Sequence, residues 1–515
     1  MKKILIAAHL DLKGVQYRHD YYEEYFRNLR AMGYVAVLVE YEDVFPFQSA
    51  TVSSHPEEVW SMDFLRHFQK LAAKENIEII PLQQCLGHLE YAFRQPENQR
   101  FSIPGSDLRD LHVAMPEARQ WLKGLLEEML RAHPESRYIH LGMDEARGFV
   151  KYAEAAGKDP LALFLSYLEE LCAVCERHGK TPLIWSDMLE DHIAPENIAQ
   201  LTALRGRVIL VPWNYSAGIK PEALVRFSGL RCSRQWLEDS RNAPHNAGEV
   251  RSNLLYYEDW APEIKALTAD FHVSPWLMEP LFQAAVWKRL GFTVWGGAGA
   301  SVTQDRSVLP YYHWREANIQ QWKHAAECHQ LDGLIMTQWM RSNSFSVPNL
   351  IPDVVWPVLS KAAGADNSTK AFFPEAEDVD DLVFKIGKCR EGWSIESLLI
   401  EKMRAQKISV HAHEWKTILL MLQVLLIYKG ITQSEELMAC YAGIGRLNEI
   451  AWGNFTEDIA DLRRQLLEIQ MRVREHLEKR YYGHALEEWF YKVFTAPLET
   501  LDRLDAQIQK NHATH

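Results

Sequence analysis

The sequence is poor in cysteine, in net positive charge and in long apolar runs, and each shortage excludes a class of protein. Seven scattered cysteines in 515 residues favour reduced thiols over a disulfide framework and predict a cytoplasmic protein. A net charge of -13 argues against a nucleic-acid partner, which needs a basic face. The longest apolar run, residues 418–428, is shorter than the roughly 20 residues that span a bilayer, so we expect no membrane partner.

Cofactor motifs are missing as well. No group of His, Cys and carboxylate residues has the spacing of metal ligands, so we expect no metal and no organic cofactor. Cys172 and Cys175 lie in an amphipathic helical stretch, where a spacing of three is typical of a helix core. Residues 296–299 (Gly-Gly-Ala-Gly) fail the dinucleotide fingerprint and predict a tight turn instead.

What the chain does contain is a regular alternation of strand-like and helix-like segments. Eight strands are expected at residues 2–10, 34–41, 77–82, 138–141, 181–185, 207–213, 292–295 and 332–339. Polar residues cluster after each of them, as in a (β/α)8 TIM barrel. An open doubly wound sheet is the competing fold, but it usually has fewer strands and a glycine-rich first turn.

The composition changes near residues 362–381, and we place a domain boundary there, with an α/β barrel at 1–362 and an α-helical region at 363–515. Helices are expected at residues 394–405, 413–429, 434–448, 458–480 and 484–494, from apolar residues that recur every three or four positions. Their apolar stripes suggest a homodimer through this region, which a molar mass from light scattering would test.

The most informative stretch is residues 137–146, in which a short apolar strand ends in Gly142, Met143, Asp144 and Glu145. Catalytic groups of β/α barrels lie at the C-terminal strand ends. Two adjacent carboxylates there are candidates for acid/base chemistry, because burial can raise the pKa of one of them. The alternative is structural, since acidic residues also favour helix N-termini.

Aromatic and polar residues follow the other strands in a way that indicates a sugar site. Four tryptophans, Trp185, Trp213, Trp295 and Trp339, end consecutive predicted strands, and together they would line a flat-walled pocket. Sugar rings present apolar C–H faces to such walls and need polar partners for their hydroxyls. The candidates for those partners are Lys13, Glu40, His88, Asp187, Tyr215 and Arg341.

The segment His140-Leu141-Gly142-Met143-Asp144-Glu145 resembles the His-x-Gly-x-Asp-Glu signature of family 20 glycoside hydrolases, the β-N-acetylhexosaminidases. Residues 40–46, 81–90, 185–189 and 294–296 are similar to the single-barrel, hexosaminidase D-like branch of that family. The resemblance covers about residues 1–360. It implies an N-acetylhexosamine-terminated glycan as substrate.

The resemblance also implies a retaining mechanism in which the substrate's own acetamido oxygen attacks the anomeric carbon. Glu145 would then be the general acid and base, and Asp144 would orient the acetamido group. Trp185, Trp213 and Trp339 would wall the acetamido pocket, with His88 beside the acids.

The chain departs from the family pattern at several positions. Met143 replaces a second glycine, Lys13 is the nearest candidate for a sugar-binding arginine, and Gly296 replaces a tyrosine whose acetamide contact would fall to Tyr215. Met340 and Arg341 stand where a glutamate is common, which leaves the preference between GlcNAc and GalNAc open. The alternatives are a barrel glycosidase for another sugar and a sugar-binding protein without catalysis.

Overall fold

The computed structural model describes residues 4–218, 261–274, 277–302, 305, 308–340, 350–362, 373, 375, 400–443 and 452–513. The chain forms two compact units. The first contains residues 1–12, 26–299 and 317–337, and the second contains residues 13–25, 300–316 and 338–515. The two units therefore interleave along the chain. The domain boundary expected after residue 362 stays a prediction.

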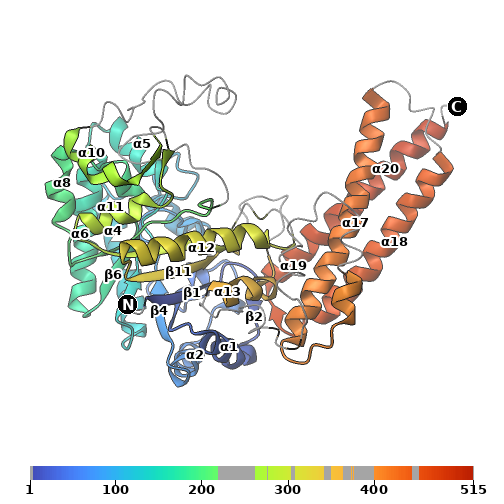
Figure 1. Cartoon of the computed structure of the whole chain (residues 1–515), viewed down its shortest axis with the longest axis horizontal. Coiled ribbons are helices and arrows are strands. Elements are labelled where there is room, and N and C mark those ends of the chain that lie inside the picture. Colours follow the sequence, from blue (N-terminus) through green and yellow to red (C-terminus); the bar gives the residue numbers. More distant parts are fainter. Residues whose placement is uncertain are drawn as a thin grey trace. The chain divides into compact units, whose positions relative to one another are not determined.

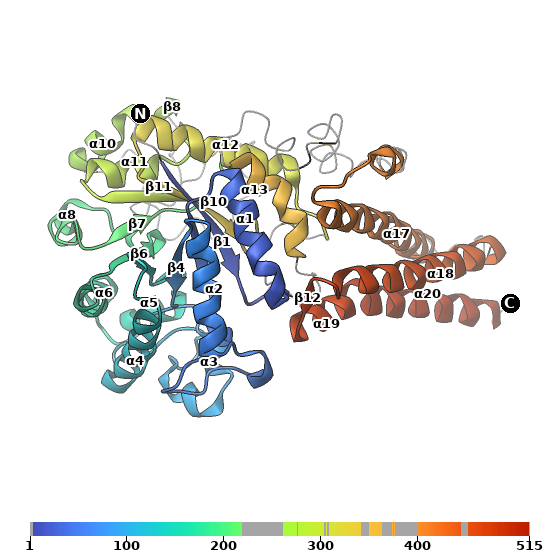
Figure 2. The same ribbon diagram turned by 90° about the horizontal axis from the view of Figure 1, so that it is seen from below.

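The first unit is built around a closed barrel of eight strands (Figures 1 and 2). In barrel order these are β1 (Leu5–Asp11), β3 (Ala36–Glu40), β4 (Glu78–Leu82), β5 (Tyr138–His140), β6 (Thr181–Trp185), β7 (Ile209–Val211), β10 (Thr293–Ser301) and β11 (Gly333–Gln338). Neighbouring strands run parallel, with registers such as Leu38 beside Ile80 and Ile184 beside Leu210. The predicted α/β fold class, a TIM barrel, is confirmed.

A helix follows each barrel strand. These helices are α1 (Tyr22–Met32), α2 (Met62–Lys74), α4 (Pro116–Ala132), α6 (Pro160–Arg177), α8 (Pro195–Thr202), α11 (Phe282–Arg289), α12 (Tyr312–His329) and α13 (Trp356–Ala362). Local signals set their ends: the Asp159 side chain caps α6 before Pro160, and Gly33, at φ +101°, follows the last residue of α1. Cys172 and Cys175 are buried on α6, as their spacing indicated.

Short elements fill the loops of the first unit: α3 (Glu90–Phe93), α5 (Arg147–Ala155), α7 (Asp187–Glu190), α10 (Pro262–Thr268), β8 (His272–Ser274) and β9 (Leu277–Met278). The 3₁₀ turns are η2 (Glu42–Val44), η3 (Pro56–Glu58), η4 (Pro96–Phe101) and η7 (Ala269–Phe271).

The turn expected at residues 296–299 is wrong, because these residues continue strand β10. Side chains on neighbouring elements explain why residues 296 and 297 are glycines, because they occupy the space that a Cβ would need. A Cβ on Gly296 would lie 2.4 Å from the ring of Trp322, and one on Gly297 would lie 2.9 Å from Cβ of Trp213. Glycine here makes room for tryptophans.

The second unit joins α-helices to a small strand pair. Its elements include η1 (His19–Tyr21), η8 (Pro352–Val355), α17 (Ala412–Gly443), α18 (Trp452–Leu477), α19 (His484–Phe490), a π-helical turn η11 (Tyr491–Thr495) and α20 (Ala496–Ala513). Strand β2 (Gln16–Tyr17) pairs with β12 (Tyr481–Tyr482), antiparallel. Helices α17, α18 and α20 lie side by side (Figures 1 and 2).

The break expected between residues 429 and 434 is wrong, since α17 runs through it as one helix. Gly430 does not end the helix. A Cβ at this position would lie 2.6 Å from Leu462 of α18, so the glycine allows the two helices to approach closely.

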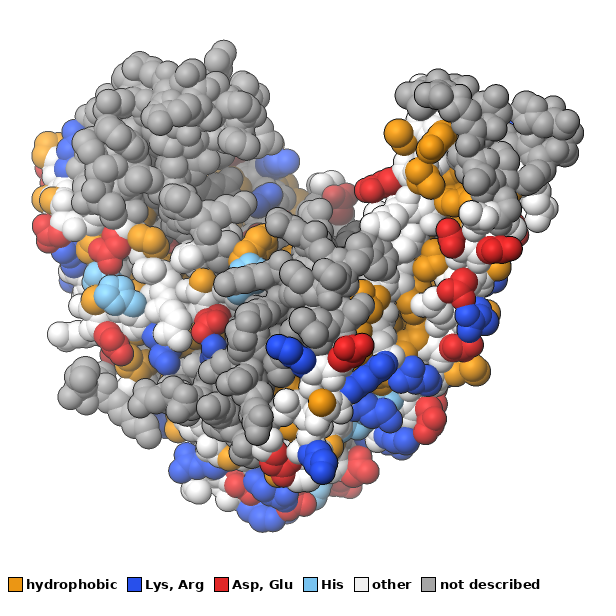
Figure 3. All heavy atoms as spheres, turned by 45° about the vertical axis from the view of Figure 1, so that its right-hand side comes forward, with side chains coloured by type: hydrophobic (Ala, Val, Ile, Leu, Met, Phe, Trp, Pro, Cys, Tyr) orange, Lys and Arg blue, Asp and Glu red, His pale blue; other side chains and the backbone are white. Residues whose placement is uncertain are grey.

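Helix α17 is long and apolar enough to cross a membrane by length and composition, and half of its most apolar stretch is buried inside the structure. A core helix of a globular protein passes the same test, so the expected absence of a membrane partner stays a prediction. Leu437, Leu467 and Met471 are exposed on α17 and α18, and Figure 3 shows apolar side chains among charged ones on these helices. The expected dimer also stays a prediction.

Candidate active site

The loop after β5 carries the two carboxylates in an unusual backbone conformation. Gly142, Met143 and Glu145 all have positive φ angles, of +66°, +77° and +48°. For a residue with a Cβ, this left-handed region costs roughly 1–2 kcal/mol. Strain of this kind concentrates at functional sites, where the surrounding structure has to stabilise it.

Met143 stands where the sequence resemblance implies a second glycine, and its φ of +77° is a conformation that glycine adopts without strain. The methionine side chain is fully buried. Burial of a methionine contributes about 1.5–3 kcal/mol, which offsets the cost of the left-handed backbone. The chain therefore tolerates the departure through packing rather than through backbone freedom.

His88 lies beside the carboxylates, as predicted. Its Nε2 is 3.3 Å from Asp144 Oδ2 and 3.6 Å from Glu145 Oε2. Burial alone would lower the pKa of His88, but the charge of Asp144 and the hydrogen bond to it raise this pKa to about 9. A protonated His88 then donates to Asp144 and stabilises its charge.

Asp187 holds the backbone of Glu145 and the ring of Trp213 at once. Its Oδ2 accepts the backbone N–H of Glu145 at 3.0 Å, and its Oδ1 accepts the indole N–H of Trp213 at 3.3 Å. Removal from water, followed by the charge of Asp144, raises the pKa of Asp187 to about 7. Asp187 thus fixes the strained acid loop to the wall of the site.

Replacing Asp187 by Asn should change how stability depends on pH. The pKa of Asp187 is higher in the folded protein, about 7, than the usual value near 3.9. The folded state therefore keeps the proton longer, and its stability is lost as pH rises from about 4 to about 7. We expect the free energy of unfolding of the wild type to fall by about 2–3 kcal/mol relative to Asp187→Asn over this range. Urea unfolding at pH 4.5 and 7.5 measures this difference, and parallel profiles would contradict it.

A buried polar layer lies below the acids, inside the barrel. Glu40, a predicted hydroxyl partner, is fully buried. It accepts from Gln84 Nε2 at 2.8 Å and lies 3.3 Å from His9 Nε2. His140 accepts the Gly142 backbone N–H through Nδ1 at 3.0 Å, and burial lowers its pKa to about 3. This layer supports the acid loop from beneath.

The predicted tryptophans have different surroundings. Trp185 ends β6 and is 1% exposed, with its ring centroid 4.4 Å from that of His140. Trp213 is half-buried and stacks on Tyr215, with the ring centroids 5.1 Å apart. These three aromatic side chains therefore lie near the acid loop, and their contacts with a sugar stay predictions.

The strand-end position expected for Trp295 is wrong, because β10 continues six residues past it. Its ring lies 5.4 Å from that of Tyr138, the first residue of β5. The acid pair follows the other end of β5, so Trp295 is directed away from it.

The remaining predicted residues lie outside the first unit or outside the described residues. Lys13 and Trp339 belong to the second unit, where the Lys13 ammonium lies 5.1 Å from the Trp339 ring centroid. Arg341 lies outside the described residues. Sugar contacts by all three stay predictions.

Arg109 contacts Glu145, and the sequence did not predict it as a site residue. Its Nη2 donates to Glu145 Oε2 at 3.1 Å. It comes from the loop between η4 and α4, 36 residues before Glu145. The available signal was the long polar segment after the third barrel strand, because such segments form the rim of a barrel site.

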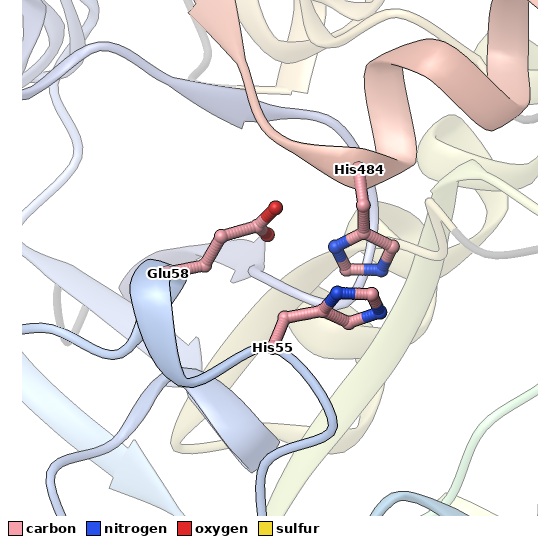
Figure 4. A group of neighbouring side chains, drawn as sticks. All are labelled: His55, Glu58 and His484. Carbon is pink, nitrogen blue, oxygen red and sulfur yellow. The ribbon is translucent and has the colours of Figure 1, made fainter.

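His55 precedes η3 and Glu58 ends it, both in the first unit (Figure 4). His484, drawn in the same figure, begins α19 in the second unit. Although these side chains have the donor atoms of a metal site, they belong to separate units, and we assign them no joint role.

The acid loop lies in a part of the chain that is similar to known proteins. Residues 26–223 match the family model "Glycosyl hydrolase family 20, catalytic domain". Human hexosaminidase D is 29% identical over 228 residues, which cover 41% of this chain and 45% of that protein. Bovine hexosaminidase D is 27% identical over 222 residues, which cover 41% of this chain and 63% of that protein. The matched region thus spans about half the length of these relatives.

Among solved structures, the chain is similar to the β-N-acetylhexosaminidase of Bacteroides fragilis. It is 19% identical and covers 41% of this chain and 46% of its own, with a TM-score of 0.32. The family model and the two relatives confirm the resemblance that the acid-pair motif indicated.

Proposed function

From its family 20 catalytic region, we propose that this chain is an exo-acting β-N-acetylhexosaminidase that removes terminal β-linked GlcNAc or GalNAc by substrate-assisted, retaining catalysis. The family match at residues 26–223 supports glycoside hydrolysis. The environment of each carboxylate supports the finer assignment of the mechanism.

One observation carries this proposal, the unequal surroundings of two adjacent acids. The side chain of Asp144 is 9% exposed and that of Glu145 is 34% exposed. Oδ1 of Asp144 is buried and accepts no hydrogen bond from any residue that the structure describes. A buried carboxylate oxygen requires a donor, and the N–H of a 2-acetamido group supplies one.

In the proposed mechanism the acetamido carbonyl oxygen forms a bond to the anomeric carbon as the glycosidic C–O bond breaks. Glu145 gives its proton to the leaving oxygen. Asp144 accepts the acetamido N–H and stabilises the positive charge that develops on the oxazolinium ring, while His88 holds Asp144. Glu145 then takes a proton from a water molecule as that water attacks the anomeric carbon. This attack opens the oxazolinium ring and gives a product with retained configuration.

Hydrolysis of aryl β-glycosides of GlcNAc, GalNAc, glucose and galactose tests the proposal. Cleavage of the two acetamido sugars alone supports substrate assistance and ranks the two epimers. Equal cleavage of glucose or galactose would contradict it, because these sugars lack the internal nucleophile. Binding of the acetamido sugars without any cleavage would favour a sugar-binding protein instead.

A further inference from the structure

Arg109 is the cation closest to the proposed general acid among the described residues of the first unit. Its Nη2 lies 3.1 Å from Glu145 Oε2 and 2.9 Å from His88 Nε2. Its Nε lies 3.9 Å from carboxylate oxygens of Glu90 and Asp110. Burial lowers the pKa of Arg109, but the hydrogen bond to Glu145 and the neighbouring acids raise it overall. Arg109 is therefore a fixed cation that lies beside three carboxylates and the His88 ring.

The loop that carries Arg109 is held by hydrogen bonds to two segments, one next to His88 and one in the helix that follows Glu145. On one side, the Leu89 N–H donates to the Arg109 carbonyl at 3.0 Å, which ties the loop to the segment of His88. On the other side, the N–H of Phe149 in α5 donates to Asp110 Oδ2 at 3.0 Å. A catalytic group is held most accurately when its supporting residues are themselves fixed, and both anchors meet this condition.

The two oxygens of Glu145 are not equivalent. Oε2 accepts from Arg109, whereas the nearest described cation to Oε1 is Arg147, at 3.9 Å and with a side chain that is 71% exposed. A guanidinium has donors but no acceptor. A proton added to the carboxyl group therefore goes to Oε1, because Oε2 is already occupied by a donor.

We propose that Arg109 is a positioning residue that anchors Oε2 of Glu145, so that Oε1 carries the proton to the leaving oxygen of the substrate. This inference rests on the proposed function. In the step concerned, the Oε1–H bond breaks, an O–H bond forms on the leaving oxygen, and the glycosidic bond electrons stay with that oxygen. Arg109 itself exchanges no proton.

Dependence on the leaving group tests this role. A phenyl β-N-acetylglucosaminide needs protonation of its aglycone, whereas the 2,4-dinitrophenyl glycoside needs little. We expect Arg109→Gln to lower kcat on the phenyl glycoside by about 10–100-fold, since a misplaced catalytic group costs about 10²-fold. On the dinitrophenyl glycoside we expect a loss below about threefold, because little general-acid catalysis remains to be lost. Arg109→Lys keeps one donor and should recover part of the loss.

Arg119→Gln is the matched control. Arg119 has a side chain that is 26% exposed against 27% for Arg109, and it pairs with Glu170, which is 33% exposed against 34% for Glu145. It should behave as wild type on both glycosides. Equal losses on both glycosides in both Arg109 variants, or no loss in either variant, would overturn the inference. Failure of the wild type to cleave either glycoside would overturn the proposed function, and this inference with it.

Discussion

Glu145→Gln should lower kcat by about 10²–10⁴-fold on glycosides with basic leaving groups, which is the contribution of a positioned general acid. The amide has nearly the same shape as the carboxyl group and can still accept from Arg109 through one oxygen. It has no proton to give to the leaving oxygen and cannot take one from water. Steady-state hydrolysis of phenyl and 2,4-dinitrophenyl β-N-acetylglucosaminides measures the effect, and the loss should be smaller on the second.

The control for Glu145→Gln is Glu170→Gln, a surface variant of the same chemistry and nearly equal exposure. It should keep wild-type kcat. A Glu145→Gln variant that hydrolyses the phenyl glycoside at the wild-type rate would remove Glu145 from the mechanism.

Arg480→Met should destabilise the second unit by about 3–5 kcal/mol, the usual result of removing one partner from a buried ion pair. Arg480 Nη1 donates to Asp353 Oδ1 at 3.1 Å and to Glu414 Oε1. Both acids are fully buried, and the Tyr21 hydroxyl also donates to Glu414, at 3.2 Å. Without the arginine, two buried carboxylates face each other with no cation between them. Urea unfolding followed by circular dichroism measures the loss.

The loss in Arg480→Met should also depend on pH. Burial, followed by the charge of Asp353, raises the pKa of Glu414 to about 7 even beside Arg480. Because this folded pKa exceeds the usual value near 4.3, stability associated with Glu414 falls as pH rises from about 4 to 7. The variant should therefore lose more at pH 8 than at pH 5, where the acid is neutral. Arg474→Met, which removes a half-exposed arginine from surface pairs with Glu478 and Glu487, should stay within about 1 kcal/mol of wild type. Equal stability of both variants would contradict the assignment.

The barrel was predictable because each of its strands and helices can be recognised from the spacing and type of the residues within that segment alone. Seven of the eight strands lie within a few residues of the expected ranges, since buried parallel strands are continuous apolar runs between turn signals. The exception is β10, which continues six residues past its expected end at residue 295. The failures share one cause. Gly296 and Gly430 resemble turn residues in sequence, yet each is glycine because a distant side chain, Trp322 or Leu462, occupies the space of its Cβ. A single sequence does not contain that tertiary information.

The site was predictable where it follows a strand end directly. Asp144, Glu145 and His88 come together as expected, because parallel strands bring their following loops to one rim. Arg109 could not be found in the same way, since its loop position depends on hydrogen bonds to residues far along the chain. The burial of Glu40 could not be predicted either. Glu40 is the last residue of β3, and its sequence position alone is the same as that of a residue exposed at the barrel rim. Only its burial beneath Gln84 and His9 distinguishes it.

The pairing of β2 with β12 has a consequence for biosynthesis. Its partners Gln16 and Tyr482 are 466 residues apart, so at ~5–20 residues per second the ribosome releases the second strand about 20–90 s after the first. Throughout that interval the aromatic residues Tyr17 and Tyr21 lack the late-made part of the second unit, including Tyr481 and Arg480, which lie against them in the finished protein. The nascent chain therefore presents apolar surface to chaperones until residues 480–482 emerge. For the same reason, a chain shortened at residue 362 would keep that surface permanently.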